Sequence, residues 1–205
     1  MEDWNKKLCT AAEEGNLKDV ELSLQNGANL EYENVSEVEI FDHEKWGRTP
    51  LMYAAMEGHL EVVMYLVTHG SQLDATDGHG QTPLMLAAER GHLEVVMYLV
   101  THGSQLEATD HIGWTPLMLA AWEGQLEVVM FLVTHGSQLE ARDTLDGETA
   151  LYCAAQNGQI DTTKWLIDQG CSPWVKSKKV KLMQQLSIIY RFTVNEIKED
   201  VYVYD

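Results

Sequence analysis

The sequence predicts an all-α solenoid, in which stacked pairs of helices are joined by short hairpin loops. Three segments are nearly identical, and their equivalent threonines, Thr49, Thr82 and Thr115, fall 33 residues apart. A fixed period of this length is typical of repeat architectures, in which one supersecondary unit recurs along the chain. Within each segment apolar residues recur at helical spacing, and a glycine closes each helical stretch. We expect about four full repeats, with a capping unit at each end.

The first helix of each unit is expected to begin at the Thr-Pro pair. The hydroxyl of Thr49 can cap free backbone N–H groups, and Pro50 suits the first helical turn. Ala54 and Ala55 give this helix a small face that allows close packing between neighbours. Gly58 can end the helix because glycine adopts the left-handed conformation without strain.

The second helix of each unit is expected to be amphipathic. Leu60, Val63 and Leu66 form an apolar stripe at helical spacing, and Gly70 ends the helix. One helix pair of this size cannot bury its apolar face alone, whereas stacked copies can. The repeats therefore predict one elongated, cooperative domain.

The motif letters resemble those of the ankyrin-repeat family, closely over residues 44–173 and more weakly over 4–34. The shared letters are Thr-Pro-Leu, Ala-Ala, Gly-His and a closing glycine, in register at a fixed period. The resemblance implies an ankyrin-repeat solenoid of helix–helix–hairpin units, with a concave face of hairpins and first helices that commonly binds a partner. The family often has His after Thr-Pro-Leu. This chain has Met52, Met85, Met118 and Tyr152 there, so we expect the usual polar ties at that site to be missing.

The repeat register divides the chain into five segments. Between the first copy and the second, ten extra residues extend a hairpin into an acidic finger, which is either a binding element or a tolerated surface insertion. Beyond the last repeat, a helix with several lysines is expected to cap the stack. The predicted segments are an N-terminal capping repeat (1–34), the finger (35–43), four repeats (44–173), a C-terminal capping helix (174–192) and an acidic tail (193–205).

The charge balance limits the classes of partner. The chain has 14 Lys and Arg against 32 Asp and Glu, a formal net charge of -18. Nucleic acids and anionic membranes both need a concentrated positive surface, so we expect neither as a partner. A basic protein or peptide fits the charge, and the acidity also favours solubility and a monomer.

The sequence offers no pattern for catalysis, a metal or a cofactor. The histidines lie in repeat turns and loops, and none has a Cys or His neighbour at metal-ligand spacing. The three cysteines show no disulfide framework, which favours a reducing, cytoplasmic setting, and export as an effector fits the same features. We therefore expect a protein that is not an enzyme and has no cofactor.

Positions that vary on the repeated frame are the candidate binding residues. Large aromatic residues and arginine dominate binding hot spots, so Trp114 and Trp122 are the leading candidates. The candidates, from hairpin tips and the ends of first helices, are Trp46, Arg48, Met56, His79, Gln81, Glu89, Arg90, Ile112, Trp114, Trp122, Glu123 and Asp146.

These residues predict a protein-binding scaffold or inhibitor that recognises its partner through the concave face. A host-directed effector and an engineered binder both fit this prediction. The alternative is a reader of methylated lysine in histone tails, because Trp114, Trp122 and Glu123 contain the elements of a cation–π cage.

Overall fold

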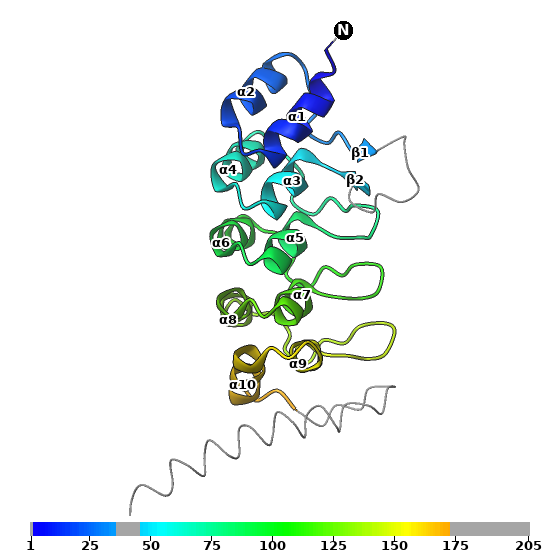
Figure 1. Cartoon of the computed structure of the whole chain (residues 1–205), viewed down its shortest axis with the longest axis vertical. Helices are drawn as coiled ribbons and strands as arrows, with labels where there is room; N and C mark the ends of the chain where they lie inside the picture. Colours follow the sequence, from blue (N-terminus) through cyan, green and yellow to red (C-terminus); the bar gives the residue numbers. More distant parts are fainter. Residues whose placement is uncertain (1, 36–45, 173–205) are drawn as a thin grey trace, which may run out of the picture.

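A computed structural model describes residues 2–35 and 46–172, which form a single stack of helix pairs (Figure 1). First helices form one column and second helices a parallel column, and the loops between units project to one side. The first helices are α1 (Trp4–Glu13), α3 (Pro50–Met56), α5 (Pro83–Arg90), α7 (Pro116–Glu123) and α9 (Ala150–Gln156). The second helices are α2 (Leu17–Gln25), α4 (Leu60–Thr68), α6 (Leu93–Thr101), α8 (Leu126–Thr134) and α10 (Ile160–Asp168).

The prediction of an all-α repeat solenoid is confirmed, with one short addition. Strands β1 (Asn34–Val35) and β2 (Trp46–Arg48) pair antiparallel at the two ends of the predicted finger. Residues 36–45, which include most of the predicted finger (35–43), lie outside the described residues, as do the predicted capping helix and tail. The proposed segment boundaries there stay predictions.

The hydrophobic core runs without interruption through the stack. Val62, Val63 and Leu66 of α4 are fully buried, as are their equivalents in α6 and α8. Where α3 packs on α1 and α5, Ala54 and Ala55 are also fully buried, because only a small side chain lets the first helices approach. Each repeat therefore depends on its neighbours for burial.

Methionine takes part in the cap of each Thr-Pro helix at its start. The backbone N–H of Met52 donates to Thr49 Oγ1, and the backbone N–H of Thr49 donates to Met52 Sδ, both at 3.4 Å. Thr82 and Met85 repeat this exchange in α5. The residue after Thr-Pro-Leu thus helps to cap the start of its own helix instead of linking two repeats.

Polar ties between repeats come instead from the residue that precedes each second helix. His59 Nε2 donates to the carbonyl oxygen of Glu13 at 3.0 Å, and His92 Nε2 to that of Met56 at 2.9 Å. Gln125 and Gln159 make the same tie in the next two repeats. Gly58 is needed beneath His92, since its φ is +77° and a Cβ there would lie 2.5 Å from the imidazole Nδ1.

A second set of ties uses carboxylates on the loops between repeats. Asp74 Oδ1 accepts a hydrogen bond from the backbone N–H of Gln105 at 3.0 Å, one repeat further on. Four such bonds succeed one another along the stack. The acceptors are Glu31, Asp74, Glu107 and Glu140, and the donors are the backbone N–H groups of Gln72, Gln105, Gln138 and Ser172. Part of the chain's acidity is therefore structural.

Candidate binding cleft on the hairpin and first-helix face

An open cleft of about 390 Å³ lies between the hairpins and first helices of neighbouring repeats. Eight of the twelve sequence-predicted binding residues line it: Arg48, Met56, His79, Gln81, Glu89, Arg90, Ile112 and Trp114. The cleft therefore brings together residues chosen only because they vary between repeats.

The other four predicted residues lie outside this lining. Trp122 contacts Trp114 at the edge of the cleft, and Glu123 is the exposed last residue of α7. Asp146 is half-buried on the following hairpin, and its backbone N–H donates to Asp143 Oδ1. Trp46 belongs to β2, but its side chain lies outside the described part of the structure.

The predicted binding residues leave out four lining residues: Leu86, Asp110, His111 and Leu119. Leu86 and Leu119 are buried, and they occupy the same position in two neighbouring repeats. Comparing these two repeats with each other gives no signal at this position, although the flanking repeats carry Tyr53 and Cys153 there. Their helical position, one turn before the end of the first helix, is the signal that could have found them.

Aspartates fix the hairpin tips that carry the cleft residues. Asp110 Oδ1 accepts the backbone N–H groups of Ile112 (3.0 Å) and Trp114 (2.8 Å). Asp77 Oδ1 does the same for His79 (2.9 Å) and Gln81 (3.0 Å). Asx turns of this kind hold a tight loop without regular secondary structure.

Adjacent hairpins are also joined to each other. The backbone N–H of His111 donates to the carbonyl oxygen of His79 at 3.0 Å, and that of Thr144 donates to the carbonyl of Ile112 at 3.1 Å. Because each tip is held both within its own turn and by its neighbour, the cleft wall is pre-organised. Pre-organisation lowers the entropy lost when a partner binds.

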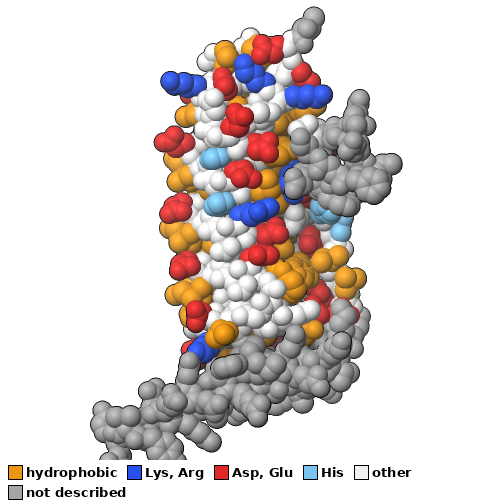
Figure 2. All heavy atoms as spheres, in the orientation of Figure 1, with side chains coloured by type: hydrophobic (Ala, Val, Ile, Leu, Met, Phe, Trp, Pro, Cys, Tyr) orange, Lys and Arg blue, Asp and Glu red, His pale blue; other side chains and the backbone are white. Residues whose placement is uncertain are grey.

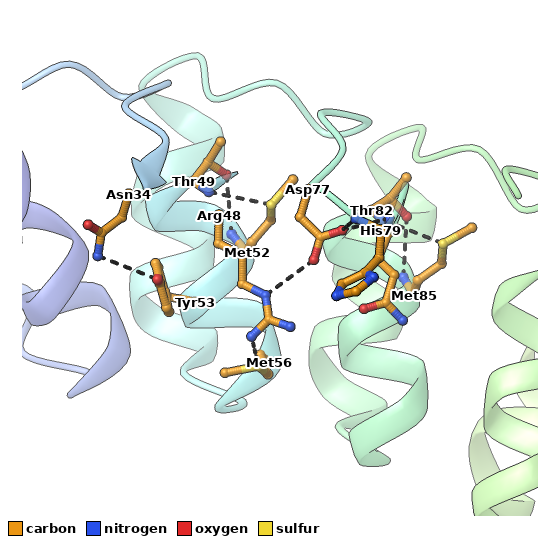
Figure 3. A network of polar contacts seen from close by, with 11 residues as sticks. Asn34, Arg48, Thr49, Met52, Tyr53, Met56, Asp77, His79, Thr82 and Met85 are labelled. Atoms are coloured by element: carbon orange, nitrogen blue, oxygen red, sulfur yellow. Dashed lines mark hydrogen bonds and ion pairs between the residues drawn. The ribbon is translucent and has the colours of Figure 1, made fainter. Parts of the chain in front are cut away.

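Arg48, predicted as a polar anchor for a partner, takes part in a link between two repeats. Its Nε lies 3.3 Å from Asp77 Oδ2, and its Nη1 donates to Met56 Sδ at 3.0 Å (Figure 3). The Arg48 side chain is 12% exposed and that of Asp77 is 0% exposed. Such a pair compensates the buried carboxylate, so much of the arginine's charge is already engaged within the protein.

The two tryptophans form a contacting pair at the edge of the cleft. Their ring centroids lie 5.4 Å apart at an interplanar angle of 56°, and both side chains are half-buried against the core. This spacing and tilt are typical of aromatic contact.

Glu89 lies in the cleft as a half-buried carboxylate. Burial raises its pKa above the ordinary range; the nearby charges of Arg90 and Arg48 and a hydrogen bond from the Gln81 side chain act in the opposite direction, while Glu123 adds to the rise. Arg90 itself is exposed at the end of α5. Figure 2 shows hydrophobic side chains gathered next to acidic and basic ones on this face.

The described residues offer little for nucleophilic or metal chemistry. Burial raises the pKa of the Cys9 thiol to about 12 and of Cys171 to about 11, and it also raises the pKa of Cys153, so all three stay protonated at neutral pH. In residues 2–35 and 46–172, no group of three or more His, Cys, Asp or Glu side chains could hold a metal ion. Over the same ranges, no helix has both the length and the apolar character needed to cross a membrane.

Helix pairs, left-handed closing glycines and tied hairpins together define a helical repeat solenoid. A family model described as ankyrin repeats (3 copies) matches residues 8–110 and 103–177, so the chain belongs to the ankyrin-repeat family. None of the curated proteins compared with the chain matches it significantly. Ankyrin repeats are generic protein-binding scaffolds.

Proposed function

We propose that this protein is a non-enzymatic binding module, a scaffold or inhibitor that recognises a protein or peptide through the cleft. The observation that carries the proposal is the cleft itself: a pre-organised wall on which the side chains that differ between repeats converge. Trp114 and Trp122 are the proposed main anchors, because half-exposed aromatic residues at the edge of a concavity are typical hot spots.

The partner we propose is a protein or peptide with basic character. A net charge of -18 would repel nucleic acids and anionic membranes, and it would steer a basic partner toward the protein. We propose that the protein acts as a monomer in the cytoplasm, either of the cell that makes it or of a host cell that receives it.

The test is to replace both tryptophans by the residue that neighbouring repeats place at the same positions. Gln81 is the equivalent of Trp114, and Gln156 is the equivalent of Trp122, so Trp114→Gln with Trp122→Gln respects the repeat frame. We expect this variant to lose proteins that the wild type captures from lysate, by about tenfold or more in quantitative mass spectrometry.

The matched control removes two large exposed side chains from the second helices α6 and α8, with Met97→Ala and Met130→Ala. We expect this control to capture the same proteins as the wild type. Circular dichroism and denaturant unfolding would check that both variants are folded. If the tryptophan variant captured its targets as well as the wild type does, the cleft would not be the binding surface.

A further inference from the structure

The charges that line the cleft are not equally available to a partner. Arg48 is committed to the fully buried Asp77. Asp110 uses Oδ1 to hold two backbone N–H groups of its own hairpin. The charged groups left in the cleft lining are Glu89 and Arg90. Glu123 lies outside the lining but its charge acts on Glu89, so the available charge in this region is negative on balance.

Glu89 stands at a position where the flanking repeats carry uncharged side chains. The equivalent residues are Met56 in α3, Trp122 in α7 and Gln156 in α9. A carboxylate at this position is partly removed from water, and Glu123 of the next repeat repels it. Its hydrogen bond from Gln81 and the charge of Arg90 offset this loss only in part, because the pKa of Glu89 stays above its ordinary value.

We propose that the partner inserts a lysine or arginine side chain into the cleft, where the cation pairs with Glu89 and the aliphatic stem lies along Trp114. This inference rests on the proposed function and names the side chain that the partner contributes to the same surface. Burial removes part of the water that stabilises the charge of the Glu89 carboxylate, and the cation would replace this stabilisation by an ion pair. The stem would cover the apolar side of the cleft, which Leu86, Leu119 and Trp114 provide.

An acidic side chain directed at Arg90 is the opposite arrangement, and the geometry disfavours it. Arg90 follows Glu89 directly in α5, and its charge already acts on that carboxylate. Glu123, the equivalent of Arg90 one repeat further on, would repel an incoming carboxylate. A cation therefore meets two favourable charges where an anion meets one.

The test uses a library of random peptides displayed on phage and selected on the full-length protein. We expect the selected peptides to share a lysine or arginine beside an apolar residue. In fluorescence anisotropy, Glu89→Gln should weaken these peptides about tenfold, as expected when a charge-assisted hydrogen bond is lost. Gln156 occupies the equivalent site in α9, so the frame accepts glutamine at this position.

Two controls test whether the loss of affinity comes from the contact between Glu89 and the basic residue of the peptide. Glu94→Gln, on the exposed side of α6, removes the same charge elsewhere and should change affinity less than about twofold, as a distant surface charge does. Replacing the peptide's basic residue by norleucine should weaken binding to the wild type about tenfold, but should change binding to Glu89→Gln much less, which is the signature of direct coupling. A trimethyl-lysine version of each peptide should bind no better than the plain one.

The outcomes separate this inference from the function on which it rests. Peptides that depend on the tryptophan pair but lack a basic residue, or that ignore Glu89→Gln, would overturn the cation site and leave the binding cleft in place. Peptides that bind Trp114→Gln/Trp122→Gln as tightly as the wild type, or a selection without any peptide, would overturn both. Preference for trimethyl-lysine would replace the ion pair by a methyl-lysine site.

Discussion

The two columns of helices differ in how much of their sequence repeats. The second helices form the outer column and the first helices form the inner column. The outer helices α4 and α6 have the same sequence, and α8 differs from them at a single residue. Inner helices α3, α5 and α7 share their first residues and diverge at the end that borders the cleft. The difference shows that packing fixes most of the shared positions, while the ends of the inner helices are free to carry a binding surface.

Burial does not explain all of the constancy in the outer column. Met64, Met97 and Met130 are 40–43% exposed and yet identical in three successive helices. Glu21 and Lys164 occupy the same position in α2 and α10, so the fold accepts charged residues there. A residue that is identical in every repeat is therefore not always buried, whereas residues that differ between repeats are a better guide to the cleft.

The largest expected effect comes from breaking the outer column. Leu99 of α6 is 0% exposed, and Leu99→Ala should lower the free energy of unfolding by about 2–5 kcal/mol, because it removes buried apolar contacts and leaves a cavity. Urea denaturation measures the loss. Gln81→Ala, at the cleft, should change stability by less than about 1 kcal/mol; equal losses at both sites would contradict the division between the columns.

A smaller loss is expected where the cleft and the framework meet. Arg48→Ala removes the ion pair of the fully buried Asp77, and it should lower the free energy of unfolding by about 1–3 kcal/mol. Arg90→Ala, at an exposed position, should be within about 0.5 kcal/mol of the wild type. If the two arginines proved equal in thermal and denaturant unfolding, the assignment of Arg48 to the framework would be wrong.

The smallest expected effect is the change with pH in the stability of a Glu89→Gln variant, which tests whether this cleft residue is held away from water. Its pKa is raised in the folded protein, so folding favours the protonated carboxyl, and that contribution is lost as pH rises through the folded pKa. The stability of Glu89→Gln relative to the wild type should therefore increase from about pH 4 to pH 7. A stability difference independent of pH would mean that Glu89 is not held away from water.

Much of the fold could be predicted because its determinants are local and repeated. Thr49, Pro50 and Gly58 mark the start and end of one helix within a few residues, and the same letters recur at each repeat. The core face of the second helix follows from periodicity alone. These features need no knowledge of how one repeat sits on the next.

The site was predicted less completely, because its details depend on contacts between repeats. Variation marked Trp114 and Glu89, but the ion pair of Arg48 with Asp77 joins residues of different repeats and has no local pattern. The ties from His59 and Gln125 to carbonyl groups of the preceding repeat were missed for the same reason. The half-burial of the tryptophan pair also follows from stacking and could not be obtained from spacing.

The hydrogen bonds from loop carboxylates to the backbone of the next repeat have a consequence for the length of the protein. Asp74 and Glu107 accept hydrogen bonds from the equivalent backbone N–H groups of Gln105 and Gln138. Each of these junctions therefore has a carboxylate acceptor on one repeat and a backbone N–H donor on the next. Deleting or inserting one whole unit in the middle of the array would rejoin compatible junctions. Such an array can lengthen or shorten its binding face by a unit at a time, while these carboxylate-to-backbone hydrogen bonds keep their type at each new junction.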